Sequence, residues 1–260
     1  MRFFIDVKEL NYHQHNLDDF YAKMHTTPNH FIYIDTLSTS LAGGNMITKG
    51  YFNGSNPNLI YFNPDMYLKK IDLDQLLLKF DNFGQDEIIS ENLHGKFTGH
   101  ITGKVHMHTD LVPIIEDSEI HLDAHIENGR LENYGLLKDF SEYFKDKNLE
   151  SVQFDTLDNK IDMVNGVITV PKMTINSSLG FFEISGIQDA DFNYEYNIRV
   201  PWKMVTQAVA SKLFKKKQNS SDNNSDEQIQ YGTKKTKYVM INLKGDSLDF
   251  KVSLLKKGKK

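Results

Sequence analysis

Residues 154–200 read FDTLDNKIDMVNGVITVPKMTINSSLGFFEISGIQDADFNYEYNIRV and indicate the fold more strongly than any other stretch. From 192 to 200 every even position is apolar or aromatic, and every odd position between them is polar or charged. Because alternate side chains of a strand point to opposite faces, this pattern predicts a strand with one apolar and one wetted face. Asn165-Gly166 predicts a tight hairpin, because both residues tolerate positive φ.

The alternation continues outward from this stretch in both directions, with turn residues between the runs. Strands are predicted at 2–8, 30–39, 45–53, 65–71, 96–109, 118–128, 151–156, 159–164, 167–176, 180–187, 191–200, 236–243 and 247–254. Helical spacing of apolar residues predicts short helices at 73–80, 134–144 and 202–214, and residues 215–232 are predicted to form a flexible loop. The fold class is therefore mainly β: a long, twisted antiparallel sheet with two or three short helices.

One-sided strands leave two architectures open. Two sheets close into a sandwich over a dry core, or one long sheet curves into a groove whose apolar lining is never fully covered by protein. If the sheet forms a groove, its lining comes from the apolar positions of three predicted strands. These residues are Phe97, Ile101, Val105, Met107, Ile120, Leu122, Ile126, Phe192, Tyr194, Tyr196, Ile198 and Val200.

Composition limits the functional classes. With 260 residues and 39% hydrophobic content the chain is long enough to bury a core, and no stretch approaches the roughly 18 apolar residues of a membrane-spanning helix. The first residues alternate apolar and charged positions, without the apolar run of a secretory signal. The absence of cysteine excludes disulfides, a thiol nucleophile and thiolate metal ligands.

Several polar clusters have both a chemical and a structural interpretation. Six histidines on or beside two neighbouring strands allow a surface metal site, although polar residues on a solvated strand face explain them equally. Three acids allow acid–base catalysis, but no nucleophile or oxyanion-binding turn accompanies them, so no catalytic residue and no metal site are assigned. The histidines are His94, His100, His106, His108, His121 and His125, and the acids are Asp155, Asp158 and Asp162.

An ordered series of motifs resembles the C-terminal region of the AsmA family, as found in Bacteroidetes-type members. It begins at Asn128 to Asn133, passes a short helix near 134–144 and a V-x-F-D-x-L strand at Val152 to Leu157, and reaches the Asn165-Gly166 hairpin. It continues with Pro171 to Ser177, Ile184 to Gly186 and the alternating strand Asp191 to Tyr196. The likeness covers residues 66–214 well and 1–65 loosely.

The resemblance implies a non-enzymatic bacterial envelope protein in the periplasm, tethered to the inner membrane by a helix that this sequence does not contain. Such proteins are similar to TamB-like and chorein-type bridge proteins, thought to carry phospholipids along an apolar β-groove. The expected ligands are phospholipid acyl chains, with no cofactor and no nucleic acid. The alternatives are a closed β scaffold that docks partners in outer-membrane assembly and, more remotely, a hydrolase.

The resemblance and the pattern together divide the chain into four parts. Residues 1–65 are expected to continue an upstream sheet, 66–214 to form the groove region, 215–232 a loop, and 233–260 a terminal hairpin with a basic tail. Residues 212–260 hold 13 lysines against 5 acids, or +8, so the first 211 residues carry −13 of the total of −5. Trp202 with Lys215, Lys216 and Lys217 is therefore expected to face an anionic membrane surface or an acidic partner, unless this end only solubilises the chain or caps the sheet.

Overall fold

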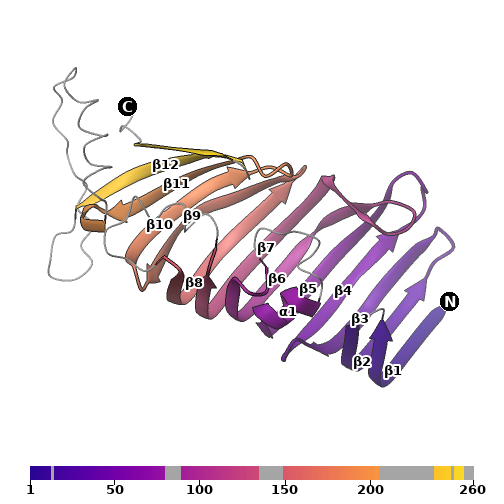
Figure 1. The fold of residues 1–260 in the computed structure, drawn as a ribbon. Helices are drawn as coiled ribbons and strands as arrows, with labels where there is room; N and C mark the ends of the chain where they lie inside the picture. Colours follow the sequence, from indigo (N-terminus) through magenta and orange to yellow (C-terminus); the bar gives the residue numbers. More distant parts are fainter. Residues whose placement is uncertain (13–14, 80–88, 135–148, 205–236, 247–248, 255–260) are drawn as a thin grey trace.

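The computed structural model describes residues 1–12, 15–79, 89–134, 149–204, 237–246 and 249–254. In these residues the chain forms one open, twisted sheet of 13 strands, each paired antiparallel with the next strand in the sequence (Figure 1). The strands are β1 (Arg2–Tyr12), β2 (His15–Thr26), β3 (Phe31–Leu41), β4 (Gly44–Asn53), β5 (Ile60–Asp72), β6 (Leu93–Met107), β7 (Pro113–Glu132), β8 (Ser151–Val164), β9 (Val167–Ser177), β10 (Gly180–Gln188), β11 (Tyr194–Pro201), β12 (Tyr238–Gly245) and β13 (Phe250–Leu254). Helix α1 (Leu73–Lys79) follows β5, and a 3₁₀ turn, η3 (Trp202–Met204), follows β11.

The predicted fold class is confirmed, and the sandwich alternative is wrong. Every described strand belongs to the same sheet, and their order in space is their order in the sequence. A sandwich requires a second sheet packed on the apolar face. The described residues form no second sheet, so the apolar face of the first is not covered in that way.

Two-residue turns fix the register at two points of the meander. Ala42 and Gly43 have φ of 44° and 71° between the paired residues Leu41 and Gly44. Asn165 and Gly166 have φ of 52° and 74° between β8 and β9, so the predicted hairpin is confirmed. Positive φ at both central residues matches the right-handed twist of the strands that the turn connects.

The strand predictions were wrong in three details. Strand β2 was missed because its apolar pattern is interrupted: Asp19 has φ of 48°, and the pairing with β3 shifts register between Asp18 and Tyr21. Such a bulge changes which residues share a face, so the period of two breaks. The two strands predicted at 151–156 and 159–164 are the single strand β8.

The third detail concerns Phe192, which was predicted to begin the alternating strand. It has φ of 62° and lies in the turn before β11, which begins at Tyr194. The Asp189 carboxylate accepts hydrogen bonds from the backbone N–H groups of Asp191 and Asn193, and the Phe192 N–H is bonded to the Asp189 carbonyl oxygen. These bonds hold the residue in a turn conformation, so it is not part of the strand.

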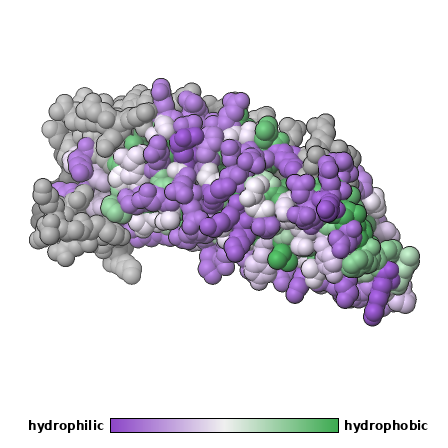
Figure 2. All heavy atoms as spheres, turned by 90° about the horizontal axis from the view of Figure 1, so that it is seen from below, coloured by the Kyte–Doolittle hydropathy of each residue, from purple (hydrophilic) through white to green (hydrophobic). Residues whose placement is uncertain are grey.

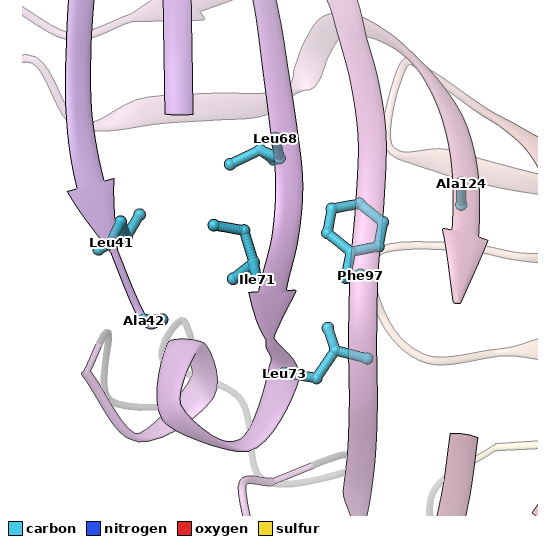
Figure 3. Close-up of a cluster of buried hydrophobic side chains, with 7 residues drawn as sticks. All are labelled: Leu41, Ala42, Leu68, Ile71, Leu73, Phe97 and Ala124. Carbon is cyan, nitrogen blue, oxygen red and sulfur yellow. The ribbon is translucent and has the colours of Figure 1, made fainter. Parts of the chain in front are cut away.

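The larger buried cluster lies on β3 to β7, where α1 packs against β5 and β6. Ile71 is fully buried at its centre, and Leu68, Phe97 and Leu73 surround it (Figure 3). Leu73 and Leu77 are the buried residues of α1, so the helix covers the end of the apolar face with one side. This burial confirms the predicted helix at 73–80 as far as Lys79, the last of its residues that the structure describes.

Two smaller clusters lie at the C-terminal end of the sheet. Leu149, Tyr194 and Leu243 form one, and Val200 with Ile241 forms the other. Residues 135–144 of the helix predicted at 134–144, the loop at 215–232 and residues 205–214 of the last predicted helix lie outside the described residues.

Candidate functional site

Cross-strand register determines which side chains share a face in the middle of the sheet, because directly paired residues point to the same side. One row runs Met66, Ile101, Leu122 and Ile161 across β5 to β8. The neighbouring rows are Ile71, Phe97, Ile126 and Leu157, and Gly103, Ile120 and Met163. The apolar positions predicted in β6 and β7 therefore come together on one surface, which we call the apolar face.

The apolar face continues to the C-terminal end. Tyr196 pairs with Gly186 on one side and with Leu243 on the other. Ile198 pairs in the same way with Ile184 and Ile241. The predicted lining residues of β11 thus share a face with apolar residues of β10 and β12. The Tyr194 and Tyr196 rings stack with their centroids 5.7 Å apart.

The lining residues are covered unequally. Phe97, Val105, Tyr194 and Val200 are buried, with 3–9% of their surface exposed. The other strand residues of the predicted lining remain half-buried. These residues are Ile101, Met107, Ile120, Leu122, Ile126, Tyr196 and Ile198. The apolar face therefore has a packed floor and a partly accessible surface along most of its length.

Glycine positions shape this surface where aromatic rings lie against the sheet. A Cβ atom on Gly99 would lie 2.4 Å from the Phe97 ring, and one on Gly186 would lie 2.3 Å from the Tyr196 ring. Cβ atoms do not approach carbon atoms so closely, so each ring occupies space that only a glycine leaves open. Gly99 and Gly103 lie on the apolar face, paired with Ala124 and Ile120.

Sequence reasoning missed the N-terminal extension of the apolar face. Phe3, Ile5 and Val7 of β1 pair with Met24, Ala22 and Phe20 of β2, and they are 36–37% exposed. Ile32 of β3, paired with Phe52, is 42% exposed. The alternation of residues 3–7 predicted a one-sided strand. Because β2 was not predicted, no strand connected these residues to the apolar positions of the later strands. Figure 2 shows hydrophobic residues gathered toward the end formed by the N-terminal strands, beyond a mostly hydrophilic middle.

The opposite face of β5 to β8 holds three of the histidines considered as metal ligands, His100, His121 and His125. His121 Nδ1 lies 2.6 Å from the Asp162 carboxylate, His125 Nδ1 lies 2.6 Å from that of Asp158, and His100 Nε2 lies 2.7 Å from Asp65. Hydrogen bonds to Asp162 and Asp158, respectively, raise the pKa of His121 and of His125 above the usual value for histidine. Each of these three imidazoles therefore pairs with a carboxylate on a neighbouring strand.

The other histidines and acids of this face also have defined positions in the described part of the chain. No group of three or more His, Asp or Glu residues there is arranged to hold a metal ion. Asp158 and Asp162 each bind a histidine, and Asp155 is exposed on β8. His94 lies 3.5 Å from Glu132, and the His106 ring lies beside that of Tyr61.

An aromatic ladder on the outward face is a second feature that the sequence did not reveal. The rings of His25, Tyr33, Tyr51, Tyr61 and His106 follow one another across β2 to β6 with centroids 4.8–6.1 Å apart. The Lys104 ammonium group lies 4.4 Å above the Tyr61 ring. Cross-strand aromatic pairs stabilise a sheet, so the ladder has a structural explanation.

Only part of the predicted membrane-facing end is described. Trp202 begins the turn η3, half-buried, and its backbone N–H donates a hydrogen bond of 2.7 Å to the Lys237 carbonyl oxygen. Lys215, Lys216 and Lys217 lie outside the described residues. None of the helices in the described ranges is both long and apolar enough to cross a membrane.

Comparisons with protein-family models, curated proteins and solved structures find no significant match for this chain. The geometry of the sheet and the motifs in the sequence therefore provide the basis for assigning a function.

Proposed function

We propose that this chain is a non-enzymatic, AsmA-like envelope protein segment that binds phospholipid acyl chains along the apolar face of its sheet. The observation that supports the proposal most is the continuity of that face from β1 to β12, with many aliphatic and aromatic side chains on it half-buried or exposed. Contiguous exposed apolar surface of this extent is uncommon in proteins without an apolar ligand or partner.

The chemistry of the lining favours movement of a ligand over tight capture. Each methylene group removed from water contributes about 0.8 kcal/mol, and a row such as Met66, Ile101, Leu122 and Ile161 offers similar contacts at every step. A ligand that slides by one strand exchanges one set of contacts for an equivalent set. Such a surface suits transfer of phospholipid between inner and outer membranes, in a periplasmic protein tethered to the inner membrane.

The proposal extends to the lysine-rich C-terminal part, which would lie near anionic headgroups. Each lysine near an anionic surface contributes about 1 kcal/mol. We expect the full chain to sediment with anionic vesicles at low salt, and replacement of Lys215, Lys216 and Lys217 by Gln to weaken this. Binding that is absent, or unchanged by both salt and substitution, would leave this end as a solubilising segment.

A matched pair of substitutions tests the apolar face itself. Leu122 lies on it, and His121, the preceding residue, lies on the outward face. Leu122→Gln should weaken uptake of a fluorescent fatty acid about tenfold, the size expected for roughly 1.4 kcal/mol of lost apolar contact. His121→Gln places the same side chain on the other face and should leave uptake unchanged.

The wild-type protein should also carry phospholipid detectable by mass spectrometry after purification. A purified chain without lipid and without probe uptake would overturn the proposal, as would equal effects of the two substitutions. The alternative function, a scaffold that docks proteins, predicts a purified chain without lipid and without probe uptake.

A further inference from the structure

Strand β1 lies at one edge of the sheet, and its outward main-chain groups pair with no strand of the described residues. Its inner edge pairs with β2 in a single register from Arg2↔His25 to Tyr12↔His15, and no strand among the described residues pairs with its outer edge. Exposed edge strands of this length are templates for pairing with another strand. All described side chains of β1 from Arg2 to Glu9 are exposed, so nothing in the described residues shields this edge.

The hydrogen bonds to β2 identify the main-chain groups that face outward. The Thr26 N–H donates to the Met1 carbonyl oxygen at 2.8 Å, and the Met1 amino group donates to the Thr26 carbonyl oxygen at 3.2 Å. The odd residue Met1 therefore forms a hydrogen-bonded pair with β2. In an antiparallel ladder such pairs alternate with non-hydrogen-bonded ones, so the even residues of β1 direct their N–H and C=O groups outward.

We propose that the outer edge of β1 pairs antiparallel with β1 of a second copy of this chain, with the two Val7 residues opposite each other. In this register Asp6 lies opposite Lys8 of the other copy, and the two-fold symmetry produces this ion pair twice. Phe4 lies opposite Leu10, also twice. All four positions are even, so they are the hydrogen-bonded positions of the new ladder.

Like charges would lie opposite each other in the three neighbouring registers of this strand pair, so those registers are disfavoured. Centring the pair on Asp6 places two carboxylates opposite each other, and centring it on Lys8 does the same with two ammonium groups. Centring it on Ile5 places Arg2 opposite Lys8 and Phe4 opposite Asp6. Like charges directly opposite destabilise a strand pair, so the Val7-centred register is the favourable one of these four.

The dimer would join the two apolar faces into one surface. Phe3, Ile5 and Val7 point to the apolar face, and paired residues share a face across the new ladder as they do within the chain. Ile5 would lie opposite Glu9 and Phe3 opposite Asn11 at the margins of this contact. The exposed apolar end of each copy would thus continue into that of its partner.

The absence of cysteine permits a direct test of the register. Opposed residues of a non-hydrogen-bonded pair have Cα atoms about 4.5 Å apart, within the range of a disulfide. The full chain carrying Val7→Cys should form a disulfide-linked dimer on mild oxidation. The matched variant Ile5→Cys should cross-link at least tenfold more slowly, because its proposed neighbour is Glu9.

Charge reversal tests the interface without a covalent bond. Wild-type protein should have twice the mass of the 30.0 kDa chain in sedimentation experiments. Lys8→Asp should give monomers, and the double substitution Asp6→Lys with Lys8→Asp should restore the dimer. Lys69→Asp makes the same charge change on β5 and should leave the dimer intact. A monomeric wild type, open-ended polymers, or cross-linking as fast at Ile5→Cys as at Val7→Cys would overturn the proposal.

Discussion

The two faces of strands β6 to β8 are built from neighbouring residues of the same chain, yet they are held by different forces. The apolar face packs Phe97 and Ile126 over a buried cluster around Ile71. The outward face pairs histidines with carboxylates at 2.6–2.7 Å in contact with water. Burial of a large apolar side chain contributes about 1.5–3 kcal/mol to folding stability, whereas an exposed ion pair contributes about 0.2–1 kcal/mol. We therefore expect stability to depend mainly on the apolar face.

The largest contrast between the faces should appear at Ile71, which is fully buried. Ile71→Ala should lower the free energy of unfolding by about 2–5 kcal/mol, because it leaves a cavity that the surrounding strands and α1 cannot fill. Lys69→Ala, on the same strand but exposed, should change it by less than about 0.5 kcal/mol. Urea unfolding followed by circular dichroism measures both. If Ile71→Ala lowered the free energy of unfolding by less than about 1 kcal/mol, the apolar face would not contribute more to stability than the outward face.

A smaller effect on the same face should come from Gly99. Gly99→Ala should destabilise the protein by about 1–3 kcal/mol, because its Cβ would lie 2.4 Å from the Phe97 ring. Phe97→Leu shortens that side chain, so the double variant should lose less stability than the sum of the two single variants. A double-mutant cycle on urea midpoints gives the coupling between the residues. Additive losses would indicate that the strain arises at the Asp123 carbonyl oxygen, 3.1 Å from the same position.

The sequence predicted the apolar face better than the outward face. Period-two alternation located the apolar positions of β6, β7 and β11, because that signal lies within one strand. It failed at β2, where the positive φ of Asp19 accompanies a break in the period, and at Phe192, where the Asp189 carboxylate stabilises a turn. Both failures depend on local backbone geometry that alternation does not record.

The pairing on the outward face depends on register, which the sequence of a single strand does not contain. His121 and Asp162 are 41 residues apart, and they meet because β7 and β8 pair at that position. The sequence singled out these residues as a metal site or as catalytic acids without pairing them. It predicted a long twisted sheet but did not exclude a sandwich, because both need the same one-sided strands.

The smallest predicted effect concerns these pairs and depends on pH. Hydrogen bonding to Asp162 and Asp158 raises the pKa of His121 and His125 in the folded protein above the usual value for histidine. Their stabilising contribution is therefore complete at a pH below the unfolded value of about 6.5, and it is lost as the pH rises through the raised folded values. Both rings are more than a third exposed, so solvent screening limits each pair to about 0.2–1 kcal/mol.

The measurement compares urea unfolding of the wild type and of the double variant His121→Gln with His125→Gln at pH 5.5 and pH 8.5. The wild type should be more stable than the variant at the lower pH, and the difference should shrink at the higher one. His108→Gln replaces an exposed histidine outside the β7–β8 pairs and serves as the control. A difference that grows with pH would mean that the neutral rings form the stronger contacts, and it would reverse the protonation state assigned to this face.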